Sequence, residues 1–268
     1  MAVELTFEKK PRFILNFIDS WVMIKRSSTH ILRNTDQLLG TFFQPIMFLV
    51  LFAAVFGGAI EKALPPGVDY LDYLMAGIIV QTVAFGSTTT AIAVCNDLQK
   101  GIVDRFRSLP MSNLAVLNGH VVSDLLRNSI STVVMIVTGL IIGFRSSASV
   151  TDWLLIAGIL LLFTFAFSWL AAIMGVIAKS VEAVQWLTFI IIFPLTFASS
   201  AFVPTEGMPA GLKAFAENQP ITQVIDAVRS LILGTPIGNA GWLSVAWSLG
   251  ILAIAVPVAA WLFKRKSA

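Results

Sequence analysis

The sequence predicts an all-α integral membrane protein with six transmembrane helices. Its 268 residues are 57% apolar and only 12% charged, whereas a soluble domain carries about 25% charged residues. Four runs of 23 to 26 residues contain no charged side chain, and a fifth run, 230–263, contains 34 uncharged residues. Because a helix needs roughly 20 residues to cross the hydrocarbon core of a bilayer, these runs predict five spans directly.

Residues 1–35 are predicted to form a cytoplasmic segment with an amphipathic helix on the membrane surface. The start of the chain lacks the apolar core and cleavage site of a signal peptide. After Pro11, polar side chains fall on one face of a helix and apolar side chains on the other. The apolar set is Phe13, Ile14, Phe17, Ile18, Trp21 and Val22. This pattern, with tryptophan and basic residues as anchors, is typical of a helix in the interface.

Residues 36–268 are predicted to form one transmembrane domain. The five direct spans fall at about 37–60, 73–96, 153–178, 183–203 and 242–263. The sixth must include the 17 uncharged residues between Arg127 and Arg145, which extend only about 26 Å as a helix. We therefore expect this helix to begin earlier and to occupy 113–144. Asp124 and Arg127 would then pair at i, i+3 and avoid lipid, where an unpaired arginine costs about 2.5–3.5 kcal/mol.

Six spans place both termini on the same side of the membrane, and the basic residues indicate which side. Fourteen lysine and arginine residues fall on the side of the termini, and four fall on the other side. Because basic residues concentrate in cytoplasmic loops, we predict that both termini are cytoplasmic. The net charge of +3 then follows from topology, so we expect no nucleic-acid partner.

A short amphipathic helix is predicted on the cytoplasmic side, over residues 97–109, between the second and third spans. Asp97 can cap its start, and Pro110 ends it. Leu98, Ile102 and Phe106 recur every four residues and would share one face. Two interpretations of this face stay open, because it can lie on lipid headgroups or dock into a soluble partner.

The outer connection before the last span, 204–239, contains two short helical patterns, 210–217 and 221–233. In the second pattern, Asp226 and Arg229 lie beside an apolar face. Each pattern is too short to cross the membrane. We therefore predict a pair of re-entrant or interfacial helices, which are tolerated where protein shields the backbone.

Several kinds of functional site are absent from the sequence. There is no G-x-x-x-x-G-K-[ST] pattern to cradle ATP phosphates, and no G-x-S-x-G pattern. Cys95, His30 and His120 are too few for a metal-ligand cluster. Cys95 is expected to pack in the core, and the histidines to be solvated or to cap helices. No acidic residue lies in the middle of a span, which disfavours a carrier driven by protons or sodium. We expect no catalytic residue, metal site or cofactor in this chain.

The cytoplasmic segment resembles the corresponding loop of type-2 ABC exporter permeases. The resemblance rests on Asp97, Lys100, Gly101, Arg105, Phe106, Leu109, Pro110, Met111 and Ser112. The segment before the last span is similar to another signature of this family, through Phe202, Val203, Pro204, Met208, Pro209, Leu212, Asn218, Pro220, Arg229 and Gly234. The similarity covers nearly the whole chain and is closest to the daunorubicin-resistance permease subfamily. Asp97 and Gln99 depart from it, because family loops often carry Glu there.

This resemblance implies the permease subunit of an ABC exporter, surrounded by lipid in a bacterial cytoplasmic (inner) membrane. A separate cytoplasmic ABC ATPase would bind ATP and Mg²⁺, and a second permease chain, in a homodimer, would complete the transporter. The exported compound would be amphiphilic and drug- or antibiotic-like, as in multidrug export. The residues that would couple the chain to the ATPase are Asp97, Leu98, Lys100, Gly101, Ile102, Arg105, Phe106 and Leu109.

In such permeases the substrate path lies at the dimer interface, formed largely by the second and fifth spans. Here each of these spans offers a face with i, i+4, i+7, i+11 spacing, apolar with a few hydroxyl and amide groups, which suits an amphiphilic substrate. The two faces are Gln81, Phe85, Thr88 and Ile92, and Gln185, Phe189, Ile192 and Thr196. Ordinary helix packing is the alternative for each residue. A permease for lipid or glycan, a secondary carrier and a membrane scaffold are the competing functions.

Overall fold

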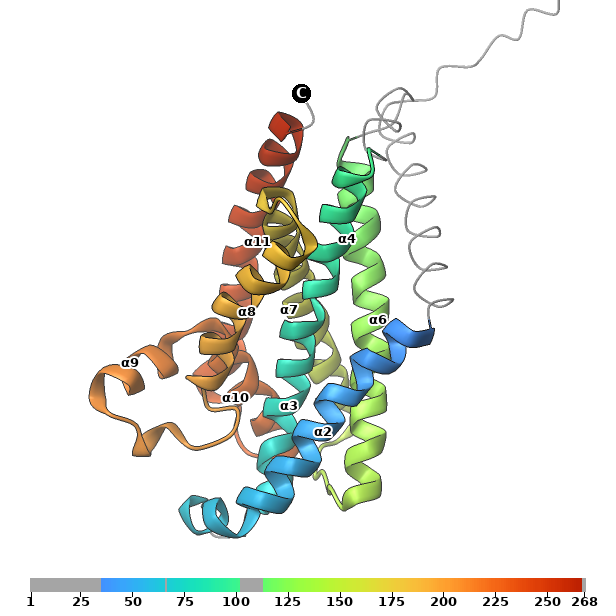
Figure 1. Cartoon of the computed structure of the whole chain (residues 1–268). Helices are drawn as coiled ribbons and strands as arrows, with labels where there is room; N and C mark the ends of the chain where they lie inside the picture. The colour runs from blue at the N-terminus through green and yellow to red at the C-terminus, as the bar shows by residue number, and fades with distance from the viewer. Residues whose placement is uncertain (1–34, 66, 102–112, 267–268) are drawn as a thin grey trace, which may run out of the picture.

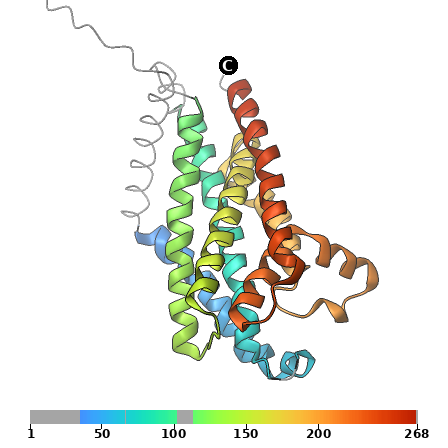
Figure 2. The same ribbon diagram turned by 180° about the vertical axis from the view of Figure 1, so that it is seen from behind.

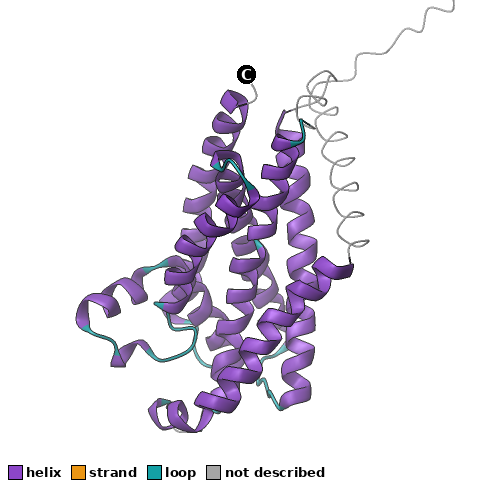
Figure 3. Cartoon of the chain, in the orientation of Figure 1, coloured by secondary structure: helices purple, strands orange, loops and turns teal. Residues whose placement is uncertain are grey.

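The computed structural model describes residues 35–65, 67–101 and 113–266, and it confirms an all-helical fold, because every regular element in these ranges is a helix (Figure 3). The α-helices are α2 (Thr35–Ile60), α3 (Tyr70–Gly86), α4 (Thr88–Gln99), α6 (Asn113–Ile142), α7 (Val150–Ile177), α8 (Val181–Phe197), α9 (Ala210–Asn218), α10 (Pro220–Leu233) and α11 (Gly238–Lys266). The 3-10 turns are η1 (Glu61–Ala63) and η2 (Thr205–Gly207). The predicted N-terminal interface helix lies outside the described residues.

Helices occupy all six predicted span ranges, although α8 ends at Phe197 rather than near residue 203. Among the described residues, five stretches are long and apolar enough to cross a membrane: Phe42–Ala63, Tyr70–Gln99, Ala115–Ile142, Val150–Ile177 and Gly238–Lys266. Helix α8 is apolar, but its 17 residues extend only about 26 Å, less than the roughly 30 Å of the hydrocarbon core. The structure supports five spans, and the sixth stays a prediction.

Local signals define several helix ends. Ser149 and Asp152 form a reciprocal capping box at the start of α7, and the Ser180 hydroxyl accepts a hydrogen bond from Ala183 N at the start of α8. Helix α10 ends at Gly234, whose φ of 67° is a left-handed conformation that glycine adopts without strain. Caps at the starts of α7 and α8 and a glycine at the end of α10 therefore mark the boundaries between successive apolar helices.

Helix α7 is the centre of the bundle, where it packs against α4, α6, α10 and α11 (Figures 1 and 2). Helix α2 crosses α3 and α6 obliquely, and α9 projects to one side (Figure 1). Many large apolar side chains remain exposed on the outside, among them Phe43, Ile141, Val150, Trp186 and Ile254. An apolar surface of this extent is expected on a protein that contacts lipid.

One end of the bundle gathers the segments that were predicted to be cytoplasmic. The end of α4, the start of α6, the α7–α8 turn and the end of α11 lie there together (Figure 1). Lys266 of α11 donates to Ala178 O at 3.0 Å, and Gln99 of α4 donates to Lys179 O at 2.7 Å. Two neighbouring helices therefore hold the turn that leads into α8. The arrangement is consistent with the predicted topology, for which the charge distribution remains the basis.

The prediction that a separate cytoplasmic helix begins at Asp97 is wrong. Helix α4 continues through Asp97 and Leu98 to Gln99, Lys100 caps its end, and Gly101 has a left-handed φ of 64°. Asp97 is buried and its Oδ2 lies 2.9 Å from His120 Nε2, so His120 is paired rather than solvated. The remaining residues of the predicted coupling set lie outside the described residues: Ile102, Arg105, Phe106 and Leu109.

The third span begins at Asn113, close to the predicted start, and carries the predicted ion pair. Arg127 Nη2 contacts Asp124 Oδ1, and the two side chains are 4% and 1% exposed. Ser168 of α7 donates to the other Asp124 oxygen. Arg127 Nη2 also donates to Gly86 O at 2.7 Å. The i, i+3 pair is therefore confirmed, and protein surrounds it.

Candidate functional site

A cavity of about 220 Å³ lies between α2, α3, α4 and α8. Its lining residues are five phenylalanines, three glutamines and one threonine: Gln44, Phe48, Gln81, Phe85, Thr88, Gln185, Phe189, Phe193 and Phe197. The wall is mainly aromatic, and the amide and hydroxyl groups supply isolated polar contacts. We call this space the aromatic cavity. A mainly apolar wall with a few polar groups is typical of a site for an organic molecule.

The aromatic cavity brings together five of the eight residues predicted to form the substrate path. Gln81 and Phe85 come from α3, Thr88 from the start of α4, and Gln185 and Phe189 from α8. Helices far apart in the sequence thus contribute to one space. The structure places these residues together, and their contact with a substrate stays a prediction.

Ile92, Ile192 and Thr196 lie away from this cavity. Ile192 is 2% exposed and Thr196 is fully buried, because both belong to the face of α8 that packs against the bundle with Val184 and Thr188. Ile92 packs against the buried cluster that contains Cys95. The predicted set on α8 therefore mixes residues from two sides of the helix. Gln185 and Phe189 face the cavity, whereas Ile192, three residues after Phe189, already lies on the side that packs against the bundle. Cys95 itself is buried and packs in the core, as predicted.

Four lining residues were not predicted: Gln44, Phe48, Phe193 and Phe197. Phe189, Phe193 and Phe197 recur every four residues, and their successive ring centroids are 4.8 and 4.1 Å apart. Phe48 of α2 meets Phe197 edge-on at 6.5 Å. The repeat on α8 is a signal in the sequence that could have identified this face. No local pattern indicates that α2 approaches it.

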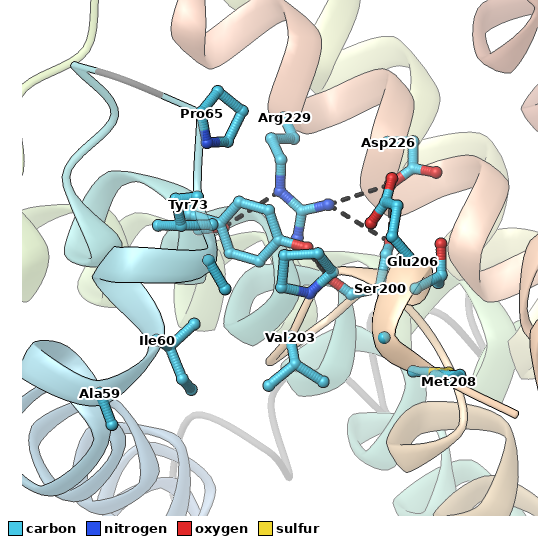
Figure 4. Close-up of a pocket in the computed structure, with 15 residues that line it drawn as sticks. Ala59, Ile60, Pro65, Tyr73, Ser200, Val203, Glu206, Met208, Asp226 and Arg229 are labelled. Carbon is cyan, nitrogen blue, oxygen red and sulfur yellow. Dashed lines mark hydrogen bonds and ion pairs between the residues drawn. The ribbon is translucent and has the colours of Figure 1, made fainter.

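A larger cavity of about 910 Å³ is lined by the residues drawn in Figure 4. The end of α2 and the start of α3, which contribute to it, lie at the opposite end of the bundle from the end of α11 (Figure 1). We call this space the outer cavity. The end of α2, the start of α3, the segment 200–208 and α10 form its wall. Figure 4 shows Arg229 between Tyr73 on one side and Asp226 and Ser200 on the other. Among the described residues of this lining, Arg229 is the only basic one, and Asp226 and Glu206 are the acidic ones.

Arg229 connects three parts of the chain at the outer cavity. Its Nε donates to Tyr73 O at 3.2 Å, its Nη1 to Asp226 Oδ1 at 2.9 Å, and its Nη2 to Ser200 O at 2.6 Å. The guanidinium also lies 3.6 Å from the centroid of the Tyr73 ring. Because its donors already have protein partners, Arg229 acts as a cross-link between α10, α3 and the segment after α8.

Burial and the neighbouring charges act in opposite directions on this cluster. Burial lowers the pKa of Arg229 from its ordinary value, and Tyr73 and Asp226 oppose that shift. Burial raises the pKa of Asp226, while the Arg229 guanidinium and the Ser200 hydroxyl lower it. Each partner of the pair therefore favours the charged form of the other, against the cost of burial.

Metal and catalytic chemistry have little support in the described part of the chain. Within residues 35–65, 67–101 and 113–266, no three histidine, cysteine, aspartate or glutamate side chains gather closely enough to hold a metal ion. The polar groups of the aromatic cavity are amides and a hydroxyl, without a titratable side chain among them.

Comparisons with known proteins identify relatives over most of the chain. The family model described as ABC-2 type transporter matches residues 19–233. The daunorubicin resistance ABC transporter permease protein DrrB1 of Streptomyces coeruleorubidus is 32% identical over 232 residues, which cover 87% of this chain and 81% of that protein. The probable doxorubicin resistance ABC transporter permease protein DrrC of Mycobacterium tuberculosis is 27% identical over 235 residues, 85% and 82% of the two chains. Nodulation protein J of Rhizobium leguminosarum bv. viciae is 22% identical over 229 residues, 83% of each.

Proposed function

The chain belongs to the ABC-2 type transporter family, and from this premise we propose that it is the permease subunit of an exporter driven by a separate cytoplasmic ABC ATPase. The ATPase would bind ATP and Mg²⁺ and change conformation on hydrolysis. The permease would bind an amphiphilic organic compound and release it on the outer face. Both termini would lie in the cytoplasm of a bacterial cell, and the chain would cross the inner membrane six times.

The aromatic cavity is the observation that carries this proposal. Its phenylalanine rings offer flat apolar contact area, and the amides of Gln81 and Gln185 offer hydrogen bonds to a polar edge. An aromatic amphiphile presents the matching combination of surfaces. The names of two relatives, which refer to resistance to daunorubicin and doxorubicin, agree with this class of compound.

The size and exposure of the aromatic cavity support a dimer of permease chains. Its volume of about 220 Å³ is below the roughly 300–1,000 Å³ of a typical ligand site. Phe189 and Phe193 line it and remain 45% and 36% exposed. A second chain placed against this side would bury both rings and enlarge the site. An identical chain is the simplest partner, so we propose a homodimer.

Replacing Phe189 tests the cavity as a substrate site. Phe189→Ala removes a ring from the wall, so the doxorubicin concentration that half-maximally stimulates ATP hydrolysis should rise roughly fivefold, about 1 kcal/mol. Ile190→Ala is the matched control, because Ile190 is adjacent, 63% exposed and not part of the lining. Equal responses of the two variants would contradict the assignment of the cavity.

Purification of the tagged chain tests the ATPase partner. From gently solubilised membranes, the wild-type chain should carry a stoichiometric soluble protein with a P-loop. Phe106→Asp should insert normally and lose that protein, because a charge would disrupt the apolar face predicted for the coupling segment. If the wild-type chain arrives alone in several mild detergents, a secondary carrier becomes the better proposal. If Phe106→Asp retains the ATPase, the coupling assignment fails.

A further inference from the structure

The second span is interrupted near its middle. The apolar stretch Tyr70–Gln99 is long enough for one continuous helix, yet α3 ends at Gly86 and α4 begins at Thr88. Thr90 N donates to Ser87 O at 3.0 Å, the bond of a tighter turn, in place of the Gly86 carbonyl that a regular helix would use. A freed backbone carbonyl inside the membrane needs another donor.

A buried arginine from the third span supplies that donor. Arg127 Nη2 donates to Gly86 O at 2.7 Å, and Thr89 Oγ1 donates to the same oxygen at 2.8 Å. Asp124 holds the guanidinium, and Ser168 of α7 holds Asp124. Three helices therefore meet at the interruption, which we call the helix break.

Polar atoms around the helix break lack partners among the described residues. They are Thr90 Oγ1, Arg127 Nε and both amide atoms of Asn128. Their residues are each at most 4% exposed. The Asn128 amide lies against the break, because a Cβ added to Gly86 would stand 2.0 Å from Asn128 Oδ1. Thr90 is one helical turn from Gly86. Buried polar atoms are rarely left unpaired in native proteins.

The chemistry of these atoms indicates which ligand they take. Arg127 can only donate hydrogen bonds, so a metal cation would find a positive charge and too few acceptors. Asp124 neutralises Arg127, which leaves no net charge for an anion. Thr90 and Asn128 each offer both a donor and an acceptor. Water is the small ligand that can satisfy donors and acceptors together, and it does so at buried polar sites in many proteins.

We propose that Thr90, Arg127 and Asn128 bind internal water at the helix break, and that this hydrated break is the joint at which the second span bends. Phe85 and Thr88 flank the break and line the aromatic cavity on its other side, so bending there changes the cavity wall. When the helix bends, a water molecule can replace one hydrogen-bond partner with another. In a break without water, bending would break hydrogen bonds between protein groups with nothing to replace them. The role as a joint rests on the proposed transport function; the water site does not.

Hydrogen–deuterium exchange of the purified chain tests the water site directly. Backbone amides of residues 86–91 should exchange at least roughly tenfold faster than those of residues 164–172 in α7, because exchange requires water at the amide. Asn128→Leu, which keeps the shape and removes the hydrogen bonds, should slow exchange at 86–91. Equal protection of the two segments in the wild-type chain would overturn the proposal.

The sign of a stability change provides a second, independent test. Thr164 is a matched control for Thr90, because it is equally buried and its hydroxyl donates to Leu160 O at 2.6 Å. If water pairs with Thr90, both Thr90→Val and Thr164→Val lose a hydrogen bond and should lower the melting temperature by roughly 2–4 °C. If the site is dry, Thr90→Val removes an unpaired hydroxyl and should raise it, which would overturn the proposal.

Coupling in the assembled transporter tests the joint. Asn128→Leu should retain the ATPase and the apparent affinity for doxorubicin, while the amount transported per ATP falls roughly fivefold or more. Ile190→Ala serves as the control with unchanged coupling. If hydrogen–deuterium exchange shows water at the break and Asn128→Leu still transports as much compound per ATP as the wild type, the break is not a joint. That result would leave the proposed water site unaffected. Failure of the wild-type chain to bind an ATPase would instead refute the proposed function and leave the exchange and stability results unaffected.

Discussion

Two Asp–Arg pairs in this protein share the same local arrangement and differ in their surroundings. In each, an aspartate and an arginine three residues later contact one another on one helix. Arg229 has protein partners at Nε, Nη1 and Nη2 and rests on the Tyr73 ring. Arg127 uses Nη2 twice and leaves Nε without a partner among the described residues. The same i, i+3 motif can therefore be a saturated cross-link or the edge of a site with spare hydrogen-bonding capacity.

The aspartates of the two pairs differ in their exposure to solvent. The Asp226 side chain is 40% exposed beside the outer cavity, and the Asp124 side chain is 1% exposed. Water from the outer cavity can reach Asp226 when a partner is removed. Asp124 depends on Arg127 and Ser168. The comparison predicts different responses to matched substitutions.

The largest effects are expected from replacing either arginine, and the first test is Arg229→Met. This change removes the bonds to Tyr73 O, Ser200 O and Asp226, so the free energy of unfolding should fall by about 3–5 kcal/mol. Arg229→Lys keeps the positive charge but not the planar guanidinium with its several N–H donors. The lysine variant should therefore be destabilised less than Arg229→Met but more than the wild type. Thermal unfolding in detergent, followed by tryptophan fluorescence, measures both. A loss below about 1 kcal/mol for Arg229→Met would show that the cross-link matters little.

Replacing both residues of a pair at once should affect the stability of the two pairs differently. Arg127→Met leaves Asp124 charged and without its ion-pair partner, at a cost of about 3–5 kcal/mol. Adding Asp124→Asn should recover most of that loss, because Gly86 O keeps the hydrogen bond from Thr89 Oγ1. The corresponding double change at Asp226 and Arg229 should stay destabilised, because the carbonyls of Tyr73 and Ser200 lose their donor. A double-mutant cycle of unfolding free energies measures this. Similar recovery at both pairs would remove the distinction between them.

The smallest effects are expected from two serines that each donate to the aspartate of one pair. Ser168→Ala should cost about 1.5–3 kcal/mol, because the Asp124 oxygen that it serves is buried. Ser200→Ala should cost about 0.5–1 kcal/mol, because water can replace its hydrogen bond to the exposed Asp226. Unfolding of the two variants under identical conditions gives the comparison. The reverse order would show that the difference in exposure between the two aspartates does not decide the cost.

Sequence patterns predicted the helices better than their contacts. The 17-residue uncharged run before Arg145 was enough to place the start of the third span at Asn113 and to predict the Asp124–Arg127 pair, because both depend on helical spacing within one segment. The same spacing failed on α8, where Ile192 and Thr196 pack inward. Helical periodicity groups residues into faces, but an apolar helix carries apolar side chains on every face, so composition cannot say which face meets the cavity.

Residues at the end predicted to be cytoplasmic also show that a contact between helices can override a local pattern. Asp97 has the residue type of a helix cap, and local pattern favours a new helix there. In the structure α4 continues to Gln99, because Asp97 meets His120 of α6 and no longer has to serve as a cap. A contact between residues 23 positions apart overrode a local preference.

The sequence by itself determined the membrane class, the helical content, the location of each apolar helix and the pairing of charges within a helix. All of these depend on hydrophobicity, length and spacing along one segment. The tertiary structure alone decided the break at Gly86, the faces that line the aromatic cavity, and the difference between Arg127 and Arg229. Each of these depends on which backbone carbonyls and side chains another helix brings into reach, and no periodicity within one segment encodes that approach.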